Sequence, residues 1–374
     1  MSAWNQNRLT AKLRIEYPII QGPFGGFSSQ RLTAAVSNFG GLGSFGAYNL
    51  GPEEIKDVIA EIRSLTAKPF AMNLWVSRED PGASTSDEAA FNRSLAPLMR
   101  YLDELSAQRP QYKPYAPLRF EDQARVVLDA KAPVFSFIFG IPPAEILDEC
   151  RAKGIITIGT ATTPDEATAL QDAGVDAVVA SGFEAGGHRG SFLRSADDSL
   201  TGTLSLVPQI VDSIDVPVIA AGGIADARGV IAAFALGAEA VQIGTAFLAC
   251  EESGASEIHR EALLKGEARR TGLTKGFTGR LARGIQNRLM DELNREGTPI
   301  LPYPLQRALV RNVSLAAESA GRSDLMPLWA GQSASISSCT DVEIFLRLLI
   351  DEVSEVAGPV VEWSARRKAN DSAA

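Results

Sequence analysis

The feature that most constrains this chain is a series of eight short apolar segments, each followed by a stretch with helical periodicity. The segments are residues 17–23, 41–47, 68–76, 133–140, 154–160, 177–182, 217–223 and 240–247. Strands that are apolar almost throughout are typical of a parallel sheet whose outer face is covered by helices. Eight alternating β/α units over about 250 residues predict an α/β fold, the TIM (β/α)8 barrel. An open doubly wound sheet is the alternative, but the eight units and the glycine-rich segment ends favour the barrel.

The barrel is expected to occupy residues 1–252, and residues 253–374 predict a smaller C-terminal helical cap domain whose last helix returns to the barrel. Two helix starts inside the barrel are well marked: Thr163 precedes Pro164, and Gly51 precedes Pro52, with acidic residues following each proline. Residues 77–118 form a polar insertion that is too long for an ordinary loop after a strand. The insertion is either a lid over the active-site face or a surface excursion.

The composition narrows the expected partners and the compartment. The 374 residues include 36 Lys+Arg and 45 Asp+Glu, a net charge of −9 without a basic block, so neither nucleic acid nor an anionic membrane is an expected partner. Three widely spaced cysteines fit neither a disulfide framework nor a zinc site and suit a reducing compartment. The first residues lack the apolar core of a signal peptide, and the most apolar region, 217–250, carries charges. We therefore expect a cytoplasmic protein.

The last two strand ends predict a phosphate site. In TIM barrels phosphate often binds in the loops after strands seven and eight, and both loops here are glycine-rich. Glycine lets backbone N–H groups approach phosphate oxygens closely, a threonine hydroxyl can add a bond, and a helix starting near Asp226 would point at the same place. The candidates are Gly222 and Gly223 in the first loop and Gln242, Ile243, Gly244 and Thr245 in the second.

The loop after the sixth segment, GFEAGGHRGSF (182–192), contains His188, one of only two histidines in the chain. A histidine at a strand end in glycine-rich backbone is expected to be accessible, and its ordinary pKa near 6.5 suits proton abstraction at neutral pH. The other histidine, His259, lies in a charged helical pattern and is expected at the surface. Glu184 is expected to bind loop amides, whereas Arg189 either reaches an anionic substrate or is solvated. No cluster of metal ligands is recognisable.

The remaining strand ends complete a pocket for a flat, phosphorylated molecule. Residues 21–26 supply small residues, including Gly22, and one apolar plate, Phe24. Asn73 and Ser136 supply polar groups at the third and fourth strands. Flavin mononucleotide (FMN) matches this description better than a sugar phosphate, because few carboxylates are placed to bind hydroxyls.

Several segments are similar to nitronate monooxygenases, a family once called 2-nitropropane dioxygenases. They are YPIIQGPFGGFSS, AVSNFGGLGS, FAMNLWV, AGVDAVVASGFEAGGHRGSF, the segment from VPVIAAGGI to TAFLACEESGA and LTKGFTGRLARGIQN, with weaker matches at LPYPLQ and WAGQS. The resemblance implies FMN as cofactor and His188 as catalytic base. The full set of expected cofactor contacts is Gly22, Asn73, Ser181, Gly186, Gly187, Gly222, Gly223, Gln242, Ile243, Gly244, Thr245 and Gly331. The family usually has glutamine at the position of Ser181 and often methionine at that of Phe24, so this chain departs from it at one flavin contact and one pocket wall.

The implied reaction is oxidation of alkyl nitronates by O2 to a carbonyl compound plus nitrite or nitrate, with His188 first taking the α-proton of a neutral nitroalkane. Propionate 3-nitronate is one candidate substrate, and its carboxylate would need a cation such as Arg189, Lys275, Arg280 or Arg283. Two alternatives remain: an FMN-dependent NAD(P)H oxidoreductase of the enoyl-acyl-carrier-protein reductase or quinone reductase type, and a non-redox phosphate-binding barrel. The segment LTKGFTGRLARGIQN favours the monooxygenase.

Overall fold

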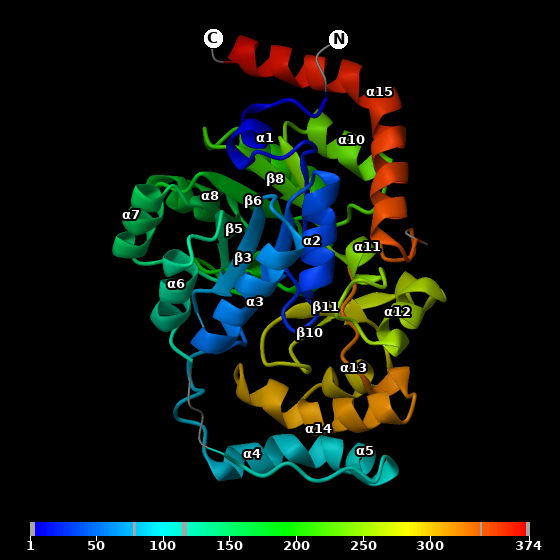
Figure 1. Ribbon diagram of the computed structural model, residues 1–374. Helices are drawn as coiled ribbons and strands as arrows, with labels where there is room; N and C mark the ends of the chain where they lie inside the picture. The colour runs from blue at the N-terminus through cyan, green and yellow to red at the C-terminus, as the bar shows by residue number, and fades with distance from the viewer. Residues whose placement is uncertain (1–3, 78–79, 114–117, 337–338, 372–374) are drawn as a thin grey trace.

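A computed structural model describes residues 4–77, 80–113, 118–336 and 339–371 (Figure 1). Each of the eight apolar segments contains one strand of a single parallel sheet. The strands are β1 (Ile19–Gln21), β2 (Gly43–Gly46), β3 (Phe70–Trp75), β4 (Val134–Ile138), β5 (Ile156–Ala161), β6 (Ala177–Ser181), β8 (Val218–Ala221) and β9 (Ala240–Ile243). Their order is β1-β9-β8-β6-β5-β4-β3-β2, and a parallel bridge between Ile20 and Leu42 joins the first and last strands. The sheet therefore closes on itself, and the predicted TIM barrel is confirmed.

Helices surround the barrel because each crossover between parallel strands packs an apolar face back onto the sheet. They are α2 (Gln30–Phe39), α3 (Pro52–Leu65), α6 (Phe120–Asp129), α7 (Ala144–Lys153), α8 (Pro164–Asp172), α9 (Thr203–Val211) and α10 (Ala227–Ala235), with α1 (Arg8–Leu13) before the first strand. The two marked helix starts are correct: Thr163 caps α8 by accepting from the Glu166 amide, and Gly51 precedes α3. The long helix α15 (Val342–Asp371) packs against α10 and α2.

The cap region contains a sheet that the sequence did not predict. Strand β7 (Gly187–His188) pairs antiparallel with β11 (Ala282–Ile285), which pairs antiparallel with β10 (Thr271–Thr274). Around this sheet lie α11 (Thr245–Leu248), α12 (Glu257–Leu264), α13 (Arg288–Leu293) and α14 (Leu305–Ser319). A second hydrophobic core, separate from that of the barrel, unites them. The strands of the hairpin are short and glycine-rich, which explains why their periodicity was not recognisable.

The described part of the insertion packs on the cap. Helices α4 (Glu88–Leu95) and α5 (Met99–Glu104) contribute Phe91, Leu98 and Tyr101 to the second core, and Figure 1 shows them beside α14 on its side away from the barrel. In the described residues the two helices therefore cover the cap and do not cover the barrel strand ends. Residues 78–79 and 114–117 of the insertion lie outside the described residues.

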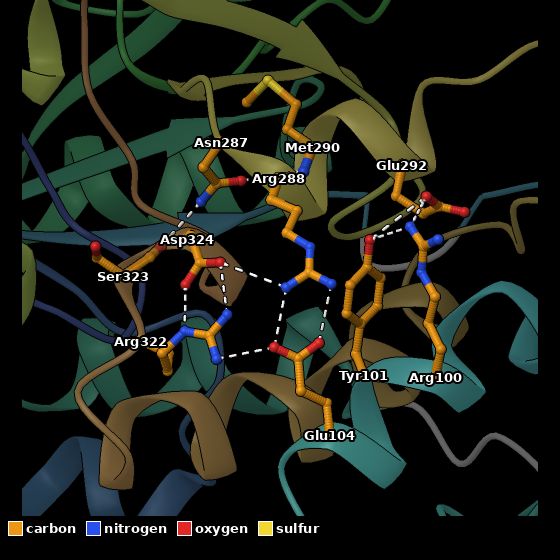
Figure 2. Close-up of polar contacts among 10 residues, drawn as sticks. All are labelled: Arg100, Tyr101, Glu104, Asn287, Arg288, Met290, Glu292, Arg322, Ser323 and Asp324. Atoms are coloured by element: carbon orange, nitrogen blue, oxygen red, sulfur yellow. Dashed lines mark hydrogen bonds and ion pairs between the residues drawn. The ribbon is translucent and has the colours of Figure 1, made fainter.

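Ion pairs reinforce this attachment (Figure 2). Glu104 at the end of α5 binds Arg288 of α13 and Arg322, each at 2.9 Å, and Asp324 binds Arg322 at 2.7 Å. Hydrogen bonds from the two arginines hold the pKa of Glu104 below its ordinary value. Exposed pairs of this kind add little individually, so the apolar contacts of α4 and α5 remain the main attachment. No helix within the described ranges is long and apolar enough to span a membrane.

Candidate functional site

The glycine loops meet in one continuous surface at the carboxyl ends of the strands. The Gly22 amide donates to the Ile243 carbonyl at 2.8 Å, and a Cβ at Gly22 would lie 3.3 Å from the Gly244 Cα. After β8, Gly222 and Gly223 have φ values of +104° and +72°. Such backbone favours glycine because a side chain would clash with its own carbonyl. The ends of β1 and β9 are therefore in contact, and β8, which carries Gly222 and Gly223 after it, pairs beside β9.

A second set of contacts joins these loops to the cap. A Cβ at Gly186 would lie 2.6 Å from the Gly331 amide nitrogen, which itself donates to the Thr245 hydroxyl at 2.9 Å. Glu184 accepts from the Thr203 amide and hydroxyl, each at 2.9 Å, so the expectation that it binds the loop is confirmed. Gly186 and Gly331 thus touch, although 145 positions separate them in the sequence.

The cradle formed by these glycines has open space above it. A Cβ at Gly187 would meet no atom within 4 Å, and one at Gly244 would meet only the Phe24 ring at 3.8 Å. Within the described ranges, the backbone N–H groups of Gly223 and Gly244 donate to no protein acceptor. Backbone donors that face open space can bind an anion. The cradle is thus chemically suited to phosphate.

Polar side chains lie on the neighbouring strands. Asn73 does not end its strand as expected: it is buried inside β3, which continues to Trp75, and donates from Nδ2 to the Ser136 hydroxyl of β4 at 3.0 Å. Gln242 and Ser181 are half-buried at the ends of β9 and β6. The Ser181 carbonyl accepts a hydrogen bond from Arg189, which holds the backbone at this position.

His188 lies beside this cradle, on β7 opposite Ala282. Its Nε2 is 2.8 Å from the Thr278 hydroxyl. Aromatic rings enclose it: the centroids of Trp75 and Trp329 lie 5.0 and 5.3 Å from the imidazole. Phe139 and Tyr303 follow at 6.4 and 6.1 Å. The ring is half-buried and packed, which is less open than the sequence suggested.

Two arginines place positive charge near this histidine. Burial, together with the charges of Arg280 and Arg307, lowers the pKa of His188 to about 3. Arg280 is only 7% exposed; its Nε donates to Asp80 at 2.8 Å, and its guanidinium lies 4.3 Å from the Phe139 ring centre. The imidazole is therefore neutral at physiological pH, in a pocket with positive potential.

Arg307 differs from Arg280 because tyrosine hydroxyls, and not a carboxylate, are its partners. Its guanidinium lies 5.4 Å from the ring centre of Tyr48, and the hydroxyls of Tyr48 and Tyr303 accept hydrogen bonds from it. Among the residues that the structure describes, no carboxylate pairs with Arg307. Arg307 is consequently the available cation on the wall of the site.

Two expectations about charged side chains were wrong. His259 is 1% exposed instead of lying at the surface, because its Nε2 bonds to the Trp329 carbonyl at 2.9 Å and its ring packs on Phe27. Arg189 neither reaches a substrate nor is solvated; it is buried and donates to the carbonyls of Ser199 and Thr162.

Most of the other cations considered for a substrate carboxylate are also engaged elsewhere. Lys275 pairs with Asp197 at the surface at 2.6 Å, and Arg283 donates to the Phe183 carbonyl at 3.0 Å. Of the four, Arg280 is the one whose charge lowers the pKa of His188.

A model of one protein family, described as nitronate monooxygenase, matches residues 6–352. The chain belongs to the nitronate monooxygenase family. It is 41% identical over 354 residues to a probable nitronate monooxygenase of Staphylococcus aureus (strain Newman), covering 94% of this chain and 99% of that protein. This membership makes the chain an oxidoreductase, in a family of flavin-dependent enzymes.

Solved structures extend the likeness. A nitroalkane oxidase from Streptomyces ansochromogenes superposes with a TM-score of 0.83 at 35% identity, covering 93% of this chain and 98% of that one. FabK from Thermotoga maritima superposes at 0.73 and 30% identity, covering 96% and 99%. Both similarities run over nearly the whole length, so the barrel and the cap are shared together.

Sequence reasoning missed most of the pocket wall. Trp75, Phe139, Tyr303 and Trp329 come from four separate segments, and only the fold places them around one histidine, with Tyr48 stacked behind Trp75. Trp75 had a usable signal, because it follows Asn73 by two positions and points to the same face of its strand. Thr278 and Arg307 had none, since both lie outside the barrel strands.

Proposed function

We propose that this chain is an FMN-dependent nitronate monooxygenase that oxidises alkyl nitronates with O2 to a carbonyl compound plus nitrite or nitrate. We further propose that His188 removes the α-proton from neutral nitroalkanes. The observation that carries this proposal is a neutral, half-buried His188 beside an open glycine cradle and between two arginines. A neutral imidazole can accept a proton, and adjacent cations favour an anionic product.

The residues at the strand ends fit FMN. Gly222, Gly223, Gly244 and Thr245 would hold the phosphate, since the structure leaves donors and space there. Asn73, Ser181, Gly186, Gly187, Gln242, Ile243, Gly22 and Gly331 complete the proposed contacts from the neighbouring strand ends and the cap. The flavin supplies the redox chemistry between substrate and oxygen.

The chain's own residues bind and orient the substrate and hold its proton. Trp75, Phe139 and Trp329 exclude water from around the imidazole. Water exclusion strengthens the attraction between a nitronate and the guanidinium groups of Arg280 and Arg307. A preformed nitronate has already lost its α-proton and needs only this binding, whereas a neutral nitroalkane also needs the base.

Propionate 3-nitronate would use one cation more than a simple alkyl nitronate. We propose that its carboxylate binds Arg307, because Arg280 is already paired with Asp80. Arg307→Gln should then lower kcat/KM for propionate 3-nitronate by about tenfold or more relative to ethylnitronate, since charge-assisted bonds contribute about 1.5–3 kcal/mol. Equal losses for both substrates would refute the assignment.

The experiment that tests the function is His188→Asn with oxygen uptake. The variant should keep the flavin absorbance of the purified protein and lose about 10²–10⁴-fold of nitroalkane turnover, the usual contribution of a positioned base. Oxidation of the preformed nitronate should fall much less. Unchanged nitroalkane turnover would remove His188 from the mechanism.

One specific observation favours a second candidate function, that of an NAD(P)H oxidoreductase: FabK matches at a TM-score of 0.73 over 96% of this chain. An NAD(P)H oxidoreductase on this scaffold would be bleached rapidly by NADH or NADPH without oxygen. Bleaching by a nitronate and not by NAD(P)H supports the monooxygenase. A colourless protein that cannot be reconstituted with FMN would refute both redox functions and favour the non-redox phosphate-binding barrel.

The proposed location is the cytoplasm, which fits the free thiols of Cys150, Cys250 and Cys339. Cell fractionation tests it directly.

A further inference from the structure

Thr278 holds the ring of His188 from the turn between β10 and β11. The threonine is 3% exposed, and the turn is closed by the Gly279 amide, which donates to the Lys275 carbonyl at 2.7 Å. The Thr278 hydroxyl oxygen has three neighbours: Nε2 of His188 at 2.8 Å, and the backbone nitrogen and oxygen of Arg280, each at 3.3 Å.

These three contacts determine where the protons lie. The Arg280 N–H can only donate, so it occupies one lone pair of the hydroxyl oxygen. The Arg280 carbonyl can only accept, and the Thr278 hydroxyl is placed to donate to it at 3.3 Å. A hydroxyl has one proton and two lone pairs, and one lone pair remains for Nε2. With all three contacts made at once, Nε2 carries a hydrogen and donates it to Thr278.

The other ring nitrogen is then the basic one. Nδ1 of His188 makes no hydrogen bond with any residue that the structure describes. Nδ1 is also not completely buried. In the described part of the chain, Oε2 of Glu252 is the one completely buried side-chain oxygen or nitrogen without a hydrogen-bond partner, so Nδ1 must have some accessible surface. Nδ1 thus has a free lone pair with access to open space.

We infer that Thr278 is a positioning residue that fixes His188 as the Nε2–H tautomer, so that Nδ1 is the atom that accepts the substrate's α-proton. The inference rests on the proposed function, since it assigns an atom to the proposed base. In the step, the α C–H bond breaks, its electron pair passes into the nitro group to give the nitronate, and the proton goes to Nδ1. The bond from Nε2 to Thr278 is present before and after, so no hydrogen bond has to rearrange.

Among the described residues, the charged and titratable groups near His188 come from the hairpin, from α14, from the insertion and from the aromatic wall of the pocket. Arg280 lies on the hairpin, Arg307 lies on α14, and Asp80 reaches the ring only through its pair with Arg280. Tyr303 meets the imidazole edge to face, and Tyr48 is stacked on the other aromatic neighbour, Trp75. None of these groups hydrogen-bonds to Nδ1, so Thr278 alone selects the tautomer within the described residues.

The first test is the ¹⁵N NMR spectrum of the purified flavoprotein labelled at histidine. The chain has only two histidines, and His259 provides an internal standard. Its Nε2 bonds to a backbone carbonyl, which can only accept, so His259 is an Nε2–H tautomer by necessity. His259→Gln assigns the two sets of signals. We expect both rings to give the Nε2–H pattern, and an Nδ1–H pattern for His188 overturns the inference.

The second test compares Thr278→Val with Thr278→Ser. Valine keeps the shape and loses the hydroxyl, so the His188 signals should shift toward a mixture of tautomers while the His259 signals stay fixed. The ratio of kcat/KM for nitroethane to that for ethylnitronate should fall roughly tenfold, about the effect of one lost hydrogen bond. The fall should lie in kcat with KM nearly constant. Serine should restore both the spectrum and the ratio.

The outcomes separate this inference from the proposed function. Equal losses on both substrates in Thr278→Val, or a His188 spectrum unchanged by valine, would overturn the positioning role. If His188→Asn keeps nitroalkane turnover, the proposed function fails, and the tautomer assignment is then judged by the spectrum alone.

Discussion

The buried His259 makes the stability of this protein depend on pH in a calculable way. Its burial lowers the pKa of His259 in the folded chain to about 4, whereas an unfolded chain has a value near 6.5. Because the folded value is the lower one, the stabilisation is fully present above pH 6.5. It is lost as the pH falls from 6.5 through 4, because in this range His259 binds a proton in the unfolded chain but not in the folded chain.

The magnitude follows from the two values. The gap between 6.5 and about 4 corresponds to about 3 kcal/mol, at roughly 1.4 kcal/mol for each pH unit. This is a large part of the 5–15 kcal/mol or so by which domains are usually stable.

The assay is urea unfolding of the wild type and His259→Gln between pH 7.5 and 4.5. A glutamine amide can still donate to the Trp329 carbonyl but does not titrate in this range. The wild type should lose about 2–3 kcal/mol more than the variant over this interval. His188 titrates in both proteins, so its contribution cancels. Identical pH slopes for the two proteins would refute the reasoning.

Three further perturbations test separate parts of the structure. Gly223→Ala and Gly297→Ala both force alanine into positive φ (+72° and +77°), at a cost of about 1 kcal/mol each, but only the first should weaken FMN retention, as measured by flavin fluorescence after dilution. Equal retention in the two variants would exclude Gly223 from the cradle. Asp80→Asn leaves the charge of Arg280 uncompensated and should lower the pKa of His188 still further. The value of kcat/KM for nitroethane should then drop about 3–10-fold, and the value for ethylnitronate should drop less. An equal loss for both substrates would contradict this electrostatic account. Glu104→Gln removes the bridge from α5 to the cap and should speed tryptic cleavage within residues 88–113 at low salt; salt screens exposed pairs, so the difference should vanish at about 1 M NaCl, and a difference that persists would contradict the ionic attachment.

The sequence predicted the barrel because its strands carry a local, repeated signal. All eight segments were recognisable from their apolar runs, and the helix starts at Thr163 and Gly51 from their prolines and acids. The cap sheet was not recognisable, because β7 is two residues long and pairs with a strand almost a hundred positions away. Pairing between short, distant segments leaves no periodicity to detect.

The same division applies to the site. The glycines of the cradle lie at strand ends, where the barrel fold itself predicts a phosphate. His259 was misplaced because its charged neighbours suggested a surface helix, whereas one face of α12 packs on the second core. Arg307 and Thr278 could not be predicted, since their importance depends on the tertiary contacts of side chains with His188 and its rings.

The position of His188 depends on the cap as much as on the barrel. The cradle is built from barrel loops, but β7 carries His188 away from β6 and pairs it with β11. The turn before β11 carries Thr278, which binds the ring, and Arg280, which charges the pocket. One hairpin therefore fixes the backbone, the hydrogen bond and the electrostatic environment of the histidine at once. Substitutions in this hairpin should change proton transfer while cofactor binding persists, and substitutions in the barrel loops should do the reverse, so the two functions can be altered separately.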